Sequence, residues 1–124
     1  MEQKFYICEH CGNIVAYVKD AGVAIMCCGE KMKELVPGTV EASKEKHIPV
    51  YSVENNIVTV KVGEVEHPML DMHYIEWVSI QTNKGNQRKV LKPGEKCEVQ
   101  FALLDGETVE AVYAYCNIHG LWKK

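Results

Sequence analysis

Hydrophobic and polar residues alternate along much of this chain, with the two-residue period of a half-buried β-strand. The alternation is clean in residues 97–101, and β-branched and aromatic residues dominate 57–62, 74–82 and 109–115. Turn-forming residues separate these segments at 55–56, 83–86, 92–95 and 105–107. Short strands with turns at this spacing are typical of an antiparallel β-sandwich.

The first part of the chain contains shorter β-prone segments broken by turns. These are residues 4–7, 14–18, 23–26 and 31–36, and Pro37-Gly38 ends the last of them. So short a stretch cannot bury enough apolar surface to fold unaided, and chains of this size usually need a metal ion or disulfides. We therefore predict an all-β protein with a small metal-bound β domain at residues 1–37 and a β-sandwich at 38–124. No segment has the pattern of a convincing amphipathic helix.

The composition favours a soluble globular protein over a disordered or membrane protein. Of 124 residues, 47% are hydrophobic and 25% are charged, and no run approaches the ~18 consecutive apolar residues that span a bilayer. The amino terminus is polar and lacks the apolar core of a signal peptide, so a cytoplasmic location is expected. The net charge of −3 brings none of the basic excess of a nucleic-acid binder.

Six cysteines change this picture, because they favour metal ligation over disulfides. The cytosol keeps thiols reduced, and the adjacent pair Cys27-Cys28 is strained as a disulfide. Cys8 and Cys11 form a C-x-x-C pair, separated from Cys27-Cys28 by fifteen residues, positions 12 to 26. Two such turns facing one another give a tetrahedral sulfur site for zinc or a single iron, and the spacing does not choose between them. His10 lies inside the first turn and is interpreted as an exposed loop residue.

The other histidines and one cysteine form a second candidate site in the second domain. Pro49 makes a helix around His47 unfavourable, and Cys116 and His119 lie three residues apart in one short loop. Imidazoles with a thiolate suit iron, copper or zinc, but five protein ligands exceed the usual four of zinc and favour iron with one open position. The candidate ligands are His47, His67, His73, Cys116 and His119.

At these residues the sequence resembles desulfoferrodoxin, the two-iron form of superoxide reductase. The similarity covers essentially the whole chain, and the paired cysteines and the C-N-x-H-G-x-W segment at 116–122 are its most specific parts. The matching motifs, in chain order, are Cys8-x-x-Cys11, Cys27-Cys28, Glu45-Lys46-His47-Ile48-Pro49, His67-Pro68-Met69, His73-Tyr74-Ile75-Glu76-Trp77 and Cys116-Asn117-Ile118-His119-Gly120-Leu121-Trp122.

The resemblance implies a desulforedoxin-like first domain, whose four cysteines hold a rubredoxin-like iron, and an immunoglobulin-like sandwich with a second iron. It implies that the four histidines bind that second iron in a plane, with Cys116 as the axial ligand. Two iron ions per chain follow. Members of this family commonly form homodimers and receive electrons from rubredoxin or a similar small donor.

The activity implied is the one-electron reduction of superoxide to hydrogen peroxide, a detoxification reaction in oxidative stress. A thiolate ligand tunes the iron, and by resemblance Cys116 favours release of peroxide. Lys46 is expected to attract the anionic substrate and to orient a water that supplies a proton. Glu45 resembles the glutamate that becomes the sixth ligand of the oxidised iron; the alternative is a surface carboxylate paired with a lysine.

Three other functions compete with this hypothesis. They are a superoxide dismutase, a rubredoxin-like electron-transfer protein without superoxide turnover, and a zinc-stapled β-sandwich that binds protein partners. The first centre either relays electrons or chiefly holds the small domain together. Outside the two sites, we expect Trp77 and Trp122 to pack in the core or border the iron, and Cys97 to be a buried thiol.

Overall fold

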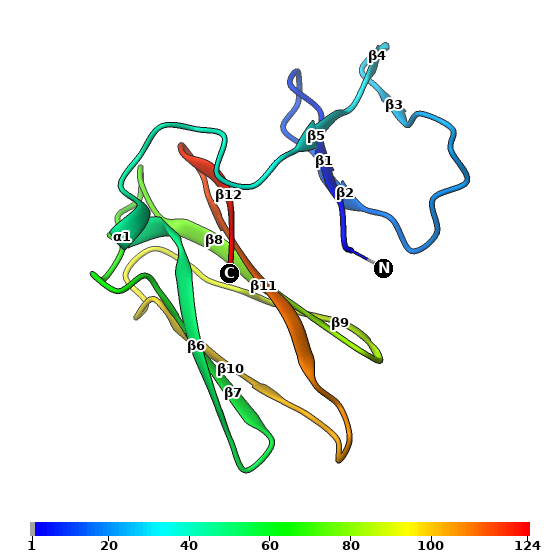
Figure 1. Ribbon diagram of the computed structural model, residues 1–124. Coiled ribbons are helices and arrows are strands. Elements are labelled where there is room, and N and C mark those ends of the chain that lie inside the picture. The colour runs from blue at the N-terminus through cyan, green and yellow to red at the C-terminus, as the bar shows by residue number, and fades with distance from the viewer. Residues whose placement is uncertain (1) are drawn as a thin grey trace. The chain divides into compact units, whose positions relative to one another are not determined.

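The structure is a computed structural model that describes residues 2–124, and it divides into two compact units. One unit ends at Val36 and the other spans Pro37–Lys124. Every strand pairing in both units is antiparallel, which confirms the all-β class (Figure 1). Within the described residues, no helix has the length and apolar character needed to cross a membrane.

The first unit is a three-stranded sheet with an added two-stranded hairpin. In the sheet, β1 lies between β2 and β5, and β3 pairs with β4 across a tight turn. The predicted strands at 23–26 and 31–36 are wrong in extent: β3 begins only at Met26, and the second segment is divided at Met32 into β4 and β5. The five strands are β1 (Phe5–Ile7), β2 (Ile14–Ala16), β3 (Met26–Cys27), β4 (Glu30–Lys31) and β5 (Lys33–Leu35).

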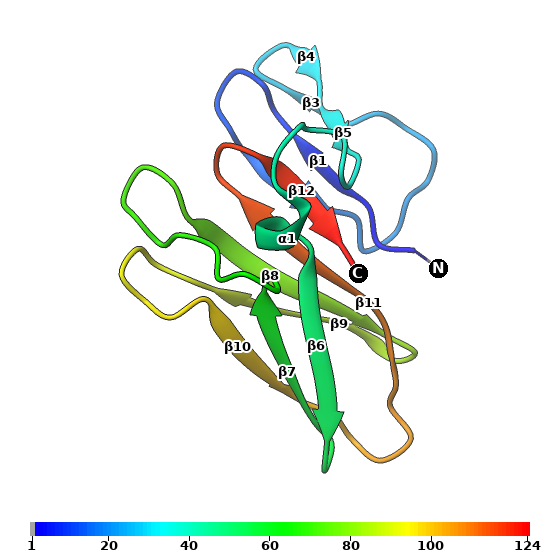
Figure 2. The same cartoon turned by 60° about the vertical axis from the view of Figure 1, so that its left-hand side comes forward.

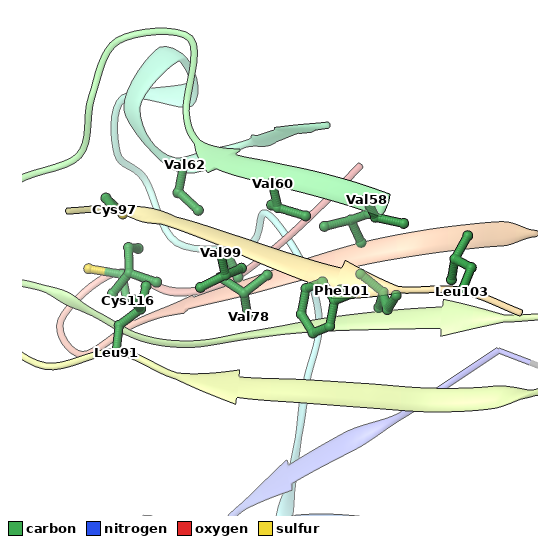
Figure 3. Close-up of a cluster of buried hydrophobic side chains, with 14 residues drawn as sticks. Val58, Val60, Val62, Val78, Leu91, Cys97, Val99, Phe101, Leu103 and Cys116 are labelled. Atoms are coloured by element: carbon green, nitrogen blue, oxygen red, sulfur yellow. The ribbon is translucent and has the colours of Figure 1, made fainter. Parts of the chain in front are cut away.

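The second unit is a sandwich of a three-stranded sheet, β10-β7-β6, and a four-stranded sheet, β12-β11-β8-β9 (Figure 2). Valines at alternate positions of β7 point toward the opposite sheet, where they meet β8 and β11 (Figure 3). This alternation is the pattern that predicted the sandwich. Its elements are α1 (Lys44–His47), β6 (Pro49–Glu54), β7 (Ile57–Val62), β8 (Ile75–Thr82), β9 (Gly85–Val90), β10 (Glu98–Ala102), β11 (Val109–Cys116) and β12 (Gly120–Lys123).

Three strands of the sandwich were not predicted. They are β6, β9 and β12, and each lies at the edge of its sheet. β9 pairs with β8 over its full length, from Thr82↔Gly85 to Trp77↔Val90, yet its side chains are almost all exposed. β6 is exposed over most of its length in the same way. An edge strand that buries few side chains has no need of apolar alternation, so the hydrophobic pattern does not reveal it.

The expectation that Pro49 disfavours a helix around His47 is wrong. Residues Lys44–His47 form one short turn of α-helix, and Ile48 has extended dihedral angles, φ −71° and ψ 118°. A proline restricts the residue directly before it, which here is Ile48. The helix therefore ends one residue earlier, and His47 is its last residue.

Candidate metal centres

The four cysteines of the first unit converge from two turns, as the spacing predicted. The turn after β1 is closed by the N–H of Gly12, which donates to the Cys8 carbonyl at 2.8 Å. The second pair lies at the β3–β4 turn, where Cys28 has a positive φ of 52°. The four sulfurs lie within 4.8 Å of one another, and His10 is exposed outside this group.

The sulfur geometry fits a tetrahedral metal ion. The Sγ atoms of Cys11 and Cys27 are 3.7 Å apart. Metal–sulfur bonds of about 2.3 Å in a tetrahedron place the sulfurs about 3.8 Å apart. Asn13 donates its side-chain N–H to the Cys27 sulfur at 3.8 Å, which is the kind of outer contact that orients a thiolate ligand.

Three of the four thiols have shifted pKa values, one lowered and two raised. The backbone N–H of Cys11 donates to the Cys8 sulfur and lowers the pKa of that thiol to about 6. Hydrogen bonds to the neighbouring sulfurs of Cys11, Cys8 and Cys27 raise the pKa of Cys28 to about 12, and those to Cys8 and Cys11 raise the pKa of Cys27. Clustered thiolates repel one another, so a cation is needed for all four to ionise together.

The second candidate site lies at one end of the sandwich. β6 begins there while β7 ends, since Pro49 pairs with Val62, and β11 ends where β8 begins, since Cys116 pairs with Ile75. Loops and strand ends that are far apart in sequence therefore meet. His47 ends α1, His67 follows β7, His73 precedes β8, Cys116 ends β11 and His119 lies in the β11–β12 turn.

The four imidazole rings surround a common centre. Neighbouring rings are nearly perpendicular, at 77° to 86°, with centroids 4.5 to 5.0 Å apart. The diagonal pair, His47 and His73, is wider at 6.2 Å, as in a square. The Cys116 sulfur lies within 4.8 Å of the ligand atoms of His47, His67 and His73 in one group, and 3.9 Å from Nδ1 of His119.

The ring nitrogens have hydrogen-bond partners that leave lone pairs facing this centre. Nδ1 of His47 donates to the Ser43 carbonyl and Nδ1 of His67 to the Pro68 carbonyl, each at 2.7 Å. A carbonyl oxygen only accepts, so in both neutral rings Nε2 carries the lone pair. These two Nε2 atoms are 3.0 Å apart, and Nδ1 of His119 lies 3.1 Å from Nε2 of His47.

Nε2 of His73 is the fourth ring nitrogen of this site. It is buried, and no hydrogen-bond partner for it exists among the described residues. A buried polar nitrogen without a partner is costly, as are the lone pairs of His47 Nε2 and His67 Nε2 at 3.0 Å from one another. A cation at the common centre satisfies all four nitrogens at once, so the residues present fit a metal ion.

The protonation preferences of the site agree with this geometry. Burial lowers the pKa of His47 and His73 and lowers that of His67 to about 4, so the rings are neutral ligands near pH 7. Burial raises the pKa of Cys116, although the backbone N–H groups of Ile118 and His119 donate to its sulfur. A nearby cation would reverse that rise, because it favours the thiolate.

Glu45 and Lys46 are exposed on α1, next to the histidines. Burial is the main cause of the lowered pKa of His47 and His73, and the positive charge of Lys46 lowers the pKa of both further. Within residues 2–124, the Glu45 carboxylate forms no ion pair, so the alternative of a lysine partner has no support in this structure.

Gly63 is a residue of this site whose role the sequence analysis missed. A Cβ atom on Gly63 would lie 2.5 Å from the Glu45 carbonyl oxygen and 2.9 Å from that of Ile48. The loop also donates the N–H of Val65 to the Glu45 carbonyl at 3.1 Å. Backbone therefore packs directly on backbone, and this contact fixes the helix that carries Lys46 and His47. A glycine directly after a β-branched strand was the available signal.

Three other side chains of the sandwich, Trp122, Trp77 and Cys97, are buried as expected. Trp122 borders the histidines, with its ring 5.0 Å from that of His47 and its N–H bonded to the His119 carbonyl at 3.1 Å. Trp77 is buried and stacks on Tyr115 at 5.5 Å. Cys97 is a buried thiol, as predicted, and burial raises its pKa to about 12.

Two family models match the chain, and together they cover nearly all of it. The model described as "Desulfoferrodoxin" matches residues 39–124, and the one described as "Desulfoferrodoxin, N-terminal domain" matches residues 1–35. The chain is 44% identical to a desulfoferrodoxin from Syntrophotalea carbinolica over 94% of this chain and 91% of that protein. It is 41% identical to the desulfoferrodoxin of Nitratidesulfovibrio vulgaris over 98% and 95%.

Solved structures give the same result. The crystal structure of the superoxide reductase from Treponema pallidum superposes with a TM-score of 0.85 at 40% identity, covering 100% of this chain and 99% of that one. The superoxide reductase (1Fe-SOR) from Giardia intestinalis superposes with a TM-score of 0.54 at 29% identity, covering 65% of this chain and 96% of that one.

Proposed function

The chain belongs to the desulfoferrodoxin family, and on that premise we propose that it is a superoxide reductase. In the reaction, superoxide, one electron and two protons give hydrogen peroxide. The observation that carries this proposal is the square of four imidazoles around a common centre, with a thiol facing the group and a buried nitrogen of His73 that has no partner among residues 2–124.

The histidine centre would hold the catalytic iron through ring nitrogens of His47, His67, His73 and His119 and through the Cys116 sulfur. Iron bound there supplies the electron that reduces superoxide. Five protein ligands leave one position of an octahedral ion for a small substrate. The hydrogen bonds from His47 and His67 to backbone carbonyls orient two of the rings and fix their tautomers, so these side chains are preorganised.

Lys46 and Glu45 have separate roles in this proposal. The side chain of Lys46 is exposed on the helix that ends at His47, so its ammonium would attract the superoxide anion and orient a water that supplies a proton. The Glu45 carboxylate is exposed on the same short helix and would ligate the oxidised iron as its sixth ligand, which displaces the product. No competing ion pair holds this carboxylate within the described residues.

The four-cysteine centre would hold a second, rubredoxin-like iron. Four thiolates suit a single iron that changes charge by one electron, and hydrogen bonds to the sulfurs tune its potential. By resemblance, electrons come from rubredoxin or a similar small donor, the protein is a homodimer, and it detoxifies superoxide in the cytoplasm.

A protein that only transfers electrons is the second candidate, and the four-cysteine site by itself would serve it. Such a protein has no need of a second centre in which four imidazoles converge and one buried ring nitrogen has no partner among the described residues. The cost of leaving His73 Nε2 buried and unpaired argues for a metal at that site.

Metal content and visible spectra of purified protein test the proposal. We expect two irons per chain, a rubredoxin-like spectrum and an added thiolate-to-iron band on full oxidation. Cys116→Ser should abolish that band and the reductase activity. Cys97→Ser is the matched control, because Cys97 is the other buried cysteine of the sandwich, and it should keep both. Full activity with an unchanged spectrum in Cys116→Ser would refute the proposed site.

A further inference from the structure

Asn117 joins the loop that carries Cys116 and His119 to the segment that carries His73. Its side-chain oxygen accepts the N–H of Tyr74 at 3.0 Å, and its side-chain N–H donates to the carbonyl of Met72 at 3.0 Å. Its backbone N–H donates to the Tyr74 carbonyl at 3.1 Å. Three hydrogen bonds thus hold the residues on both sides of His73.

His73 differs from the histidines whose rings are fixed directly. His47 and His67 each donate a ring N–H to a backbone carbonyl at 2.7 Å. Within the part of the chain described, neither ring nitrogen of His73 has such a partner. The backbone of His73 is also paired with Leu70, in both directions at 2.9 and 3.1 Å. The position of this imidazole is therefore set through its backbone, and Asn117 ties that backbone to the sandwich.

The other end of the same strand pair has an identical arrangement. Asn83 follows β8, accepts the N–H of Thr108 at 2.9 Å and donates its side-chain N–H to the Gly106 carbonyl at 3.0 Å. Its backbone N–H donates to the Thr108 carbonyl at 3.1 Å. Each of β8 and β11 is therefore followed by an asparagine that bridges residues leading into the other strand. Only the Asn117 bridge holds a candidate metal ligand.

We propose that Asn117 is a positioning residue of the histidine centre. It touches no ligand atom, but it makes the His73 segment move as one body with the loop of Cys116 and His119. Three of the five ligands would then keep fixed relative positions. This inference rests on the proposed function, since it assumes that these five residues hold iron.

The test compares Asn117→Ala with Asn83→Ala in the full chain loaded with iron. The readouts are the rate at which a chelator removes iron from the histidine centre and the position of the thiolate-to-iron band. We expect Asn117→Ala to release iron about 10- to 100-fold faster and to shift the band, because outer residues that orient ligands have effects of this size. Asn83→Ala should match the wild type in both, although each variant loses an equivalent bridge.

Wild-type iron retention in Asn117→Ala, or an equal loss in Asn83→Ala, would overturn the inference. If Asn117→Ala does not fold, Asn117→Asp carries the same test, because it keeps an acceptor for Tyr74 and loses only the donor to Met72. Wild-type retention in that variant would likewise overturn it. If the wild type itself binds no iron at the histidines, the proposed function fails as well, so the two failures are distinguishable.

Discussion

The two candidate centres hold their ligands in opposite ways. In the first unit, only Phe5 and Cys8 are buried among residues 2–36, and Cys11 and Cys28 are exposed on turns. In the second unit the ligands sit at the end of a packed core that includes Cys116 itself, at the same end as Cys97 (Figure 3). His47 and His67 are almost fully buried, at 2% and 1% exposure.

This difference indicates what each metal ion does for the fold. A unit with two buried residues has almost no core, so metal binding and folding are coupled in it. The sandwich has its own core and needs no ion to fold, so its histidines are preorganised. The metal ion of the first unit would stabilise the fold of that unit and also change charge. The metal ion of the sandwich would bind to a site that is already formed.

Removal of the metal ions should have the largest effect, and it should affect the two units differently. We expect metal-free chain to lose the structure of the first unit, because binding at such sites contributes about 10–16 kcal/mol in apparent free energy. The sandwich should stay folded. Amide NMR spectra with and without a chelator would measure this, with reloaded protein as the control. Dispersed signals from the first unit in the absence of metal would contradict the account.

The positive charge of Lys46 should speed the reaction of the histidine centre with superoxide, because superoxide is an anion. We expect Lys46→Ile to slow the second-order reaction with superoxide by about 10- to 10³-fold and to flatten its salt dependence. Rapid-mixing kinetics at several ionic strengths would show both. Lys44→Ile is the matched control, since Lys44 is exposed on the same helix, and it should have a smaller effect. Equal rates for wild type and Lys46→Ile would remove Lys46 from the mechanism.

Lowering the pH should destabilise the metal-free sandwich, because burial keeps the His67 ring neutral in the folded state. Burial lowers its folded-state pKa from 6.5 to about 4. Above pH 6.5 the ring is neutral in both states; between pH 6.5 and 4 only the unfolded state binds the proton, so stability falls, by at most about 3 kcal/mol. Denaturant titrations across this range would record the loss, and the contribution of His67 to it should level off below pH 4. His67→Asn should have a shallower slope, and an equally steep one would exclude His67 as the cause.

Gly63 should show how tightly the histidine site depends on backbone packing. Gly63→Ala forces a Cβ against the Glu45 carbonyl, and overpacking of this kind costs about 1–3 kcal/mol. We expect lower stability together with slower reaction with superoxide, because α1 must shift. Gly106→Ala is strained by its φ of +82° but has open space, so it should destabilise without slowing the reaction. Identical kinetics in the two variants would argue against the contact.

The sequence predicts the strands that bury one face and the loops that carry the ligands, because each has a recognisable pattern over a few neighbouring residues. The valines of β7 alternate because one face is buried, and the two cysteine pairs lie on turns. It does not predict β9, whose exposed residues carry no pattern, or the turn of helix before Pro49. The roles of Gly63 and Asn117 depend on contacts between distant segments, which one sequence without its fold cannot specify.

The most direct test of the central claim is the ratio of hydrogen peroxide formed to superoxide consumed, measured while the oxidation of an added electron donor is followed. A superoxide reductase yields one peroxide for each superoxide and oxidises one equivalent of donor, and we predict this ratio. One peroxide for every two superoxides, with no need for a donor, would identify dismutation and contradict the account. No consumption of superoxide by iron-loaded protein would leave electron transfer as its function.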